Sequence, residues 1–123
     1  MSQEACPCGS GHEYNLCCGR FISGKNRAES AEQLMRSRYS AYVKEDVDYL
    51  VRTTHPKSRT ADLATSIRSW MDQVQWMRLL VMKVDKRTVE FVAEYIAQGK
   101  PRQHRERSLF EKVKGEWFYV GEK

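Results

Sequence analysis

The sequence predicts an α+β fold in which helices pack on one face of an antiparallel sheet. Between residues 30 and 74 apolar side chains recur at the helical period, whereas β-branched and aromatic side chains dominate after Val74. The first twenty residues differ from both regions, because they are poor in large apolar side chains and hold all four cysteines. We therefore expect a cysteine-rich knuckle with a linker over residues 1–28, and one α+β domain over residues 29–123.

Three helices are expected in the first half of this domain. The first begins at Ser30, because Ser30 and Gln33 match a capping box. Its apolar positions repeat every three to four residues: Ala31, Leu34, Met35, Tyr39, Tyr42 and Val43. The second is expected over residues 46–54 and ends before Pro56, since proline disfavours helical backbone in the preceding residue. The third is expected over about residues 60–74.

Four strands are expected in the second half. Their predicted ranges are 75–84, 88–98, 103–113 and 116–120. Turn-forming residues separate them at Asp85-Lys86-Arg87, Gly99-Lys100-Pro101 and Lys114-Gly115-Glu116. Short connections of this kind join antiparallel neighbours, so the strands are expected to form a four-stranded meander with the three helices on one of its faces.

The composition argues against a membrane-spanning or secreted protein. The longest apolar run, Leu79–Met82, is far shorter than the ~20 residues that a membrane helix needs. The N-terminus lacks the apolar stretch of a signal peptide. These features predict a cytoplasmic location and no membrane partner. The formal net charge of +5 is only weak evidence for a nucleic-acid partner.

The four cysteines lie within thirteen residues and predict one structural Zn²⁺. They are Cys6, Cys8, Cys17 and Cys18. Gly9 and Gly11, which follow the first pair, permit the left-handed backbone angles of a tight turn. Four thiolates complete a tetrahedral zinc site with no open position, which is typical of structural rather than catalytic zinc.

Other interpretations of the cysteines remain open at this point. Four thiolates also hold iron–sulfur clusters, and His12 within the loop could replace one cysteine as a ligand. Free thiols or two disulfides are the remaining alternatives, although a bond between the adjacent Cys17 and Cys18 would be strained.

The pattern Cys6-Pro-Cys-Gly-Ser-Gly followed by Cys17-Cys18 resembles the SEC-C motif, named for the C-terminus of the SecA translocation ATPase. The resemblance continues through residues 34–43, His55-Pro56, 89–95 and 105–110. Together these segments resemble the YchJ-like family of bacterial proteins with an N-terminal SEC-C zinc-binding motif. That resemblance implies a cone of the nuclear-transport-factor-like (cystatin-like) type, and a protein partner such as a chaperone or the ribosome.

Four residues are candidates for a pocket in this cone: Arg38, Tyr42, His104 and Glu106. Arg38 interrupts the apolar face of the first helix, so it must either anchor an anionic ligand or pair with an acid of the sheet, such as Glu94 or Glu106. His104 and Glu106 alternate with Ser108 onto one strand face. Arg36, by contrast, is expected to lie on the opposite, exposed face of the helix.

Three function hypotheses follow. The first is a non-enzymatic docking module, in which the metal-held loop presents Glu13, Tyr14, Asn15 and Arg20 to a protein. The second is an enzyme or small-ligand binder that uses the cone, with no catalytic residue assigned. An enclosed pocket lined by the four candidates would favour the second hypothesis over the first.

The third hypothesis is nucleic-acid or ribosome binding by basic residues near a hairpin. These are Lys100, Arg102, Arg105 and Arg107, with Tyr95 and Trp117 expected nearby. A solvated hairpin would show the same charges.

Overall fold

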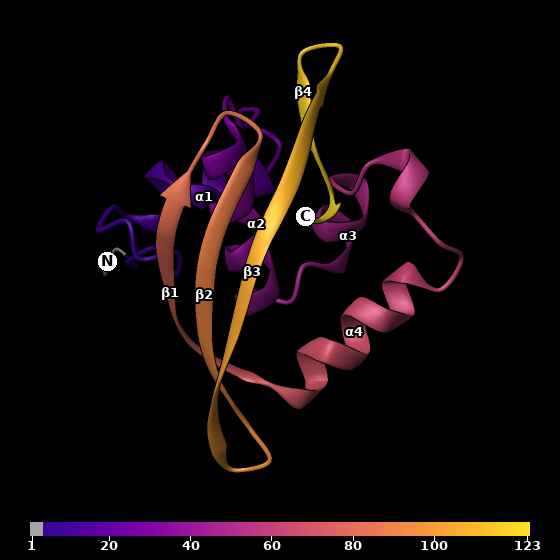
Figure 1. Ribbon diagram of the computed structural model, residues 1–123. Helices are drawn as coiled ribbons and strands as arrows, with labels where there is room; N and C mark the ends of the chain where they lie inside the picture. The colour runs from indigo at the N-terminus through magenta and orange to yellow at the C-terminus, as the bar shows by residue number, and fades with distance from the viewer. Residues whose placement is uncertain (1–3) are drawn as a thin grey trace.

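The computed structural model describes residues 4–123 and confirms the α+β class (Figure 1). Four α-helices precede the sheet in this part of the chain: α1 (Cys18–Ile22), α2 (Ala31–Val43), α3 (Val47–Arg52) and α4 (Leu63–Gln73). Two short 3-10 turns accompany them, η1 (Tyr14–Leu16) and η2 (Pro56–Ser58). The strands are β1 (Gln75–Val84), β2 (Thr88–Ala97), β3 (Lys100–Val113) and β4 (Glu116–Glu122). Among the described residues, no helix is long and apolar enough to cross a membrane.

The three expected helices are present as α2, α3 and α4. Ser30 caps α2 through its hydroxyl oxygen, which accepts a hydrogen bond from the Gln33 amide at 3.1 Å. The Gln33 side chain reaches back one residue further than expected and accepts from the Glu29 amide at 2.7 Å. Helix α4 begins at Leu63 rather than near residue 60.

Helix α1 was not expected, because the segment after the cysteines has the composition of a linker. Its apolar residue Phe21 is nevertheless only 5% exposed and belongs to the main core. The described part of the N-terminal segment therefore packs against the rest of the molecule through its cysteines and Phe21, while the division of the sequence near residue 28 stays a prediction.

The sheet has the expected order β1-β2-β3-β4 with antiparallel neighbours. The β2–β3 turn consists of Gln98 and Gly99, whose φ angles of 54° and 71° are those of a two-residue hairpin loop. Strand β3 consequently starts at Lys100, three residues earlier than expected, and Pro101 pairs with Ile96 inside the ladder. Strand β4 pairs with β3 only from Ser108 onward, so the other edge of β3 is open beside Pro101 and tolerates its missing N–H.

One face of the sheet packs on the helices and forms the inside of the cone. In Figure 1 the strands cross in front of α2, and α4 leads directly into β1. Register places Ala93 opposite His104 and Phe91 opposite Glu106. Since side chains of one strand alternate between faces, these residues share the inner face with the fully buried Val89. The alternation expected on β2 and β3 therefore brings polar side chains into the interior.

Candidate metal centre and cavity

The cysteine loop closes on itself through backbone hydrogen bonds. The Cys6 amide donates to the His12 carbonyl at 2.9 Å, and the Gly9 amide donates to the Cys6 carbonyl at 3.2 Å. Gly9 and Gly11 have φ angles of 78° and 88°, in the left-handed region that glycine adopts without strain. This reversal points both cysteines of the first pair toward the second pair.

The four sulfur atoms meet at one point. The Sγ atoms of Cys6, Cys8, Cys17 and Cys18 all lie within 4.8 Å of one another. Those of Cys8 and Cys17 are 3.7 Å apart, too far for a disulfide, and all four thiols are free. Four sulfurs at ~2.3 Å from a tetrahedral zinc would be ~3.8 Å apart. The donor set therefore fits a single tetrahedral ion.

Burial disfavours the thiolate forms of these cysteines in the absence of a cation. Cys8 is 0% exposed and Cys18 is 1% exposed. Burial is the main cause that raises the pKa of the Cys17 thiol. Contacts with the Cys6 and Cys8 sulfurs, and then burial, raise the pKa of Cys18. Hydrogen bonds from Cys18 and Cys6 lower the pKa of Cys8. A bound cation would allow all four sulfurs to be thiolates together.

No histidine or carboxylate joins the sulfur cluster among residues 4–123. The alternative ligand His12 is exposed, and its amide donates to Ser10 Oγ at 3.2 Å. The Ser10 hydroxyl in turn lies 3.2 Å from Cys17 Sγ. A hydroxyl at this distance can donate to a thiolate and hold its negative charge.

Helix α2 fastens the loop to the domain. Arg36 Nη1 donates to the Cys8 carbonyl oxygen at 2.9 Å, and its Nε lies 3.0 Å from a Glu32 carboxylate oxygen. One turn later, Ser40 Oγ lies 3.5 Å from Cys6 Sγ. The expectation that Arg36 lies on an exposed face was wrong, because the cysteine loop covers that face of the helix. The helical period alone could not show this, since the covering segment comes from outside the helix.

A cavity of about 160 Å³ lies between the inner face of the sheet, α2 and α4. Its polar lining includes all four pocket candidates, Arg38, Tyr42, His104 and Glu106, together with Ser108 and Tyr119. Its aromatic walls are Tyr39, Trp70, Trp76 and Phe91, and the remaining lining residues are Met35, Ala93 and Phe110. The structure thus brings together residues from α2, α4, β1, β2, β3 and β4.

Arg38 is held by neutral groups rather than by a carboxylate. Its Nη1 donates to the Leu50 carbonyl and to Thr53 Oγ1, both at 2.8 Å. Its guanidinium carbon lies 4.4 Å from the centre of the Tyr119 ring, a cation–π distance. Burial lowers the pKa of Arg38. The predicted ion pair was therefore wrong: Glu94 forms its ion pair with Arg78 across the β1–β2 ladder.

Glu106 is the buried anion of the cavity, and three donors surround it. His104 Nε2 lies 2.9 Å from one carboxylate oxygen, while the hydroxyls of Ser108 and Tyr119 donate to the other. Burial opposes ionisation, yet these bonds together hold the pKa of Glu106 below its usual range. The same contact raises the pKa of His104.

Sequence reasoning missed Tyr119 and the tryptophans of this cavity. Tyr119 pairs with Phe110 across the β3–β4 ladder, so its position follows only once the register is known. Trp70 and Trp76 were not among the four pocket candidates, although the structure places both in the lining. Trp76 contacts Tyr39, Tyr42 and Trp70 edge-on or tilted, and its indole N–H is buried without an acceptor among the described residues.

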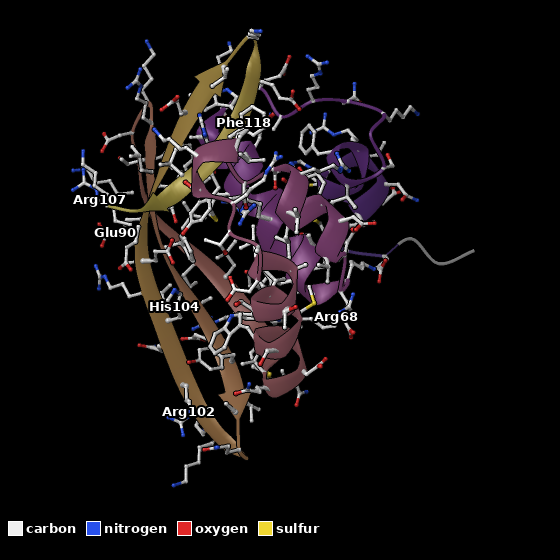
Figure 2. The ribbon with its side chains drawn as sticks, turned by 90° about the vertical axis from the view of Figure 1, so that its right-hand side faces the viewer. Arg68, Glu90, Arg102, His104, Arg107 and Phe118 are labelled. Carbon is white, nitrogen blue, oxygen red and sulfur yellow. The ribbon has the colours of Figure 1, made fainter. Side chains whose placement is uncertain are left out.

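Some of the basic residues in the nucleic-acid hypothesis already form ion pairs within the chain. Arg105 and Arg107 form ion pairs with Glu90 and Asp85, and Figure 2 shows Glu90 and Arg107 pointing away from the helices. Lys100 and Arg102 lie toward the tip of the β2–β3 hairpin. The basic residues therefore do not form one face, and Trp117 is buried in the core away from them.

The residues expected to present a docking surface on the cysteine loop are also partly engaged in contacts within the chain. The ammonium of Lys44 lies over the Tyr14 ring at 4.6 Å, and Arg20 donates to the Cys17 carbonyl at 3.1 Å. Leu16, which was not among the expected contact residues, is 66% exposed.

Two family descriptions match the chain. Residues 30–122 match "YchJ, middle NTF2-like domain", and residues 4–20 match the SEC-C motif. A UPF0225 protein of Enterobacter sp. (strain 638) is 41% identical over 123 residues, covering 95% of this chain and 81% of its own length. A UPF0225 protein of Haemophilus influenzae (strain Rd) is 39% identical over 125 residues, covering 98% of this chain and 78% of its own length.

Two solved structures share the fold. The solution structure of a SEC-C motif containing protein from Rhodopseudomonas palustris has a TM-score of 0.87 and 38% identity, and the match covers 98% of each chain. The crystal structure of a SEC-C motif containing protein from Psychrobacter arcticus has a TM-score of 0.76 and 29% identity, covering 95% of this chain and 80% of the other.

Proposed function

We propose that this chain, which belongs to the YchJ-like family of SEC-C proteins, binds one structural Zn²⁺ and uses its cone cavity to bind a small organic molecule. The observation that carries the second part is the cavity itself. It gathers a partly buried guanidinium, a largely buried carboxylate and a histidine within aromatic walls, and such sites are typical of ligand pockets.

Zinc is proposed because of the donor set and its geometry. Four thiolates with no carboxylate or imidazole among them select a soft or borderline ion. Sulfurs within 4.8 Å of one another leave room for one ion rather than for an iron–sulfur cluster. The proposal places the protein in the cytoplasm, where thiols stay reduced.

Elemental analysis of the purified, reduced protein tests the zinc proposal. We expect one zinc per chain, and substitution with Co²⁺ should give the absorption of a tetrahedral thiolate site. Cys18→Ser should lower the metal content, whereas His12→Ala should leave it unchanged. A metal-free protein with two disulfides would contradict the proposal.

The contacts of Glu106 favour binding over catalysis. Both of its carboxylate oxygens already accept hydrogen bonds from His104, Ser108 and Tyr119. A general base needs an oxygen or nitrogen free to take a proton from the substrate. Glu106 itself, whose two oxygens are engaged, therefore serves better as part of a fixed polar wall than as the proton acceptor.

A fragment collection screened by two-dimensional NMR tests ligand binding. Hits should shift the amide signals of β2 and β3 around Ala93 and His104. Ala93→Leu, which fills the cavity, should abolish these shifts. Ala97→Leu on the same strand lies outside the cavity lining and should not. Shifts confined to the outer face would contradict a binding cavity.

A docking role for the metal loop is the second candidate, and the exposed side chain of Leu16 favours it. By resemblance to SecA the partner would be a chaperone or the ribosome. Co-sedimentation with purified ribosomes tests this candidate: Leu16→Ser should reduce binding while metal content is retained. Equal sedimentation of both proteins would count against Leu16 as a contact.

A further inference from the structure

From the polar groups that the cavity leaves unsatisfied, we infer that its ligand is a small flat carboxylate, with one aromatic or unsaturated ring and an anionic group directed at Arg38 and Tyr42. This inference deepens the proposed ligand-binding function and rests on it.

The unused polar capacity of the cavity consists of donors. All bonds that Arg38 donates within residues 4–123 come from Nη1, although a guanidinium carries N–H groups on three nitrogens. The described residues provide no partner for the Tyr42 hydroxyl, which lies one helical turn from Arg38 on α2. Trp76 adds an indole N–H that is buried without an acceptor. Three lining residues thus have donors that no protein acceptor uses.

Most of the acceptor capacity of Glu106, by contrast, is already used. Glu106 accepts hydrogen bonds from His104 and Ser108 on its own strand and from Tyr119 on β4. A cationic ligand would have to compete with these donors for the carboxylate. A ligand with acceptor oxygens instead meets the free donors without breaking a bond. Leaving the buried indole N–H of Trp76 unpaired costs about 1–3 kcal/mol, so an acceptor within the cavity is favoured.

The charge balance agrees with an anion. Arg38 remains charged at any physiological pH, and the contact with Glu106 raises the pKa of the second basic group, His104. Glu106 provides the opposing charge of the cavity, and its donors hold it on the sheet side. Arg38 therefore offers a permanent positive charge to an anionic group of the ligand.

Shape and size define the rest of the ligand. The rings of Trp70 and Trp76 lie 5.9 Å apart at 74°, and with Phe91 they form flat apolar walls. A volume of about 160 Å³ is close to that of an apolar cavity of ~150 Å³ that holds benzene. The space therefore suits one ring with a short polar arm. The His104 side chain is 42% exposed, so the cavity reaches solvent there and ligands can enter.

Three ring probes of matched size, benzoate, benzyl alcohol and benzylamine, and the ringless carboxylate acetate test the inference on the wild-type, metal-loaded protein. Affinities are measured by NMR titration, with the fluorescence of Trp70 and Trp76 as a second readout. We expect benzoate to bind at least ~10-fold more tightly than benzyl alcohol, and benzylamine and acetate to bind more weakly still. Equal binding of benzoate and benzyl alcohol, or a preference for benzylamine, would overturn the inference and leave the ligand-binding function standing. If no probe shifts the cavity signals at millimolar concentration, both fall.

Variants assign the selectivity to its residues. Tyr42→Phe keeps the ring and should reduce benzoate affinity several-fold without changing that of benzyl alcohol. Arg38→Met should bring benzoate down to the level of benzyl alcohol. Arg68→Met removes a guanidinium from the exposed part of α4, labelled in Figure 2, and should change neither affinity. A preference for benzoate that survives Tyr42→Phe and Arg38→Met unchanged would overturn the assignment.

Discussion

The cysteine cluster and the cone cavity both bury polar groups against α2, but they compensate those groups in different ways. The four sulfurs converge on one point and are acceptors, so a single cation satisfies all of them. In the cavity the charges are separated: Arg38 bonds to carbonyl and hydroxyl oxygens, and Glu106 bonds to donors of the sheet. As four thiolates the first arrangement requires a cation, whereas the charges of the second are satisfied within the chain and some donors stay free for a ligand.

Of the changes that separate the two regions, metal removal should have the largest effect on stability. Cys8 and Cys18 lie in the same core as Phe21 and Leu34, so loss of the ion leaves unpaired thiols inside it. We expect chelation, or Cys18→Ser, to lower the free energy of unfolding by about 4 kcal/mol or more, the range in which loss of a metal falls. Chemical denaturation with and without chelator measures this. An unchanged transition would show that the cluster is stable without an ion.

Removal of the buried guanidinium should have the next largest effect. Arg38→Ala loses bonds to Leu50 and Thr53 and the contact with Tyr119. Hydrogen bonds to charged groups are worth about 1.5–3 kcal/mol each, and no carboxylate is left unpaired. Because removing the guanidinium also removes the cost of burying its charge, we expect a net loss of about 2–3 kcal/mol by chemical denaturation. A gain in stability would instead mean that the charge is maintained for a ligand at a cost to the fold.

Arg36→Ala tests the cysteine loop alone, because Arg36 contacts that loop and does not line the cavity. It should cost about 1 kcal/mol through the bond to the Cys8 carbonyl. It should also weaken zinc binding about 10-fold, as changes next to metal ligands do. Competition with a chromophoric chelator measures the affinity. Arg68→Ala, at an exposed helix position, is the control and should stay within about 0.5 kcal/mol. Equal zinc affinity in both variants would remove the role of Arg36.

The smallest effect concerns protonation in the cavity. The pKa of His104 is raised, so its contribution to stability is present below the ordinary value of 6.5 and is lost as pH rises through the raised value. The pKa of Glu106 is lowered, so its contribution is present above 4.5 and is lost as pH falls through the lowered value. Their bond is therefore strongest between pH 4.5 and pH 6.5.

An NMR titration of His104 in wild type and Glu106→Gln tests this bond. The variant should titrate at lower pH than the wild type, because the carboxylate that favours the charged imidazole is gone. Coincident titration curves would contradict the contact.

The sequence allowed the class of fold, the meander and the sulfur cluster to be predicted, because each depends on residues close together in the chain. Alternation along β2 and β3 likewise placed His104 and Glu106 on one face. The partners of Arg38 were not predictable, since they are the carbonyl of Leu50 and two threonine hydroxyls that only the α2–α3 packing brings near. Tyr119 was missed for the same reason: its place follows from the β3–β4 register.

Helix α2 carries both sites on opposite faces, with Arg36 and Ser40 toward the metal loop and Arg38 and Tyr42 toward the cavity. A shift of this helix moves contacts at both sites at once. Thermodynamic linkage then requires reciprocity: whatever factor metal occupancy applies to the affinity of the cavity, ligand occupancy applies to the affinity for the metal.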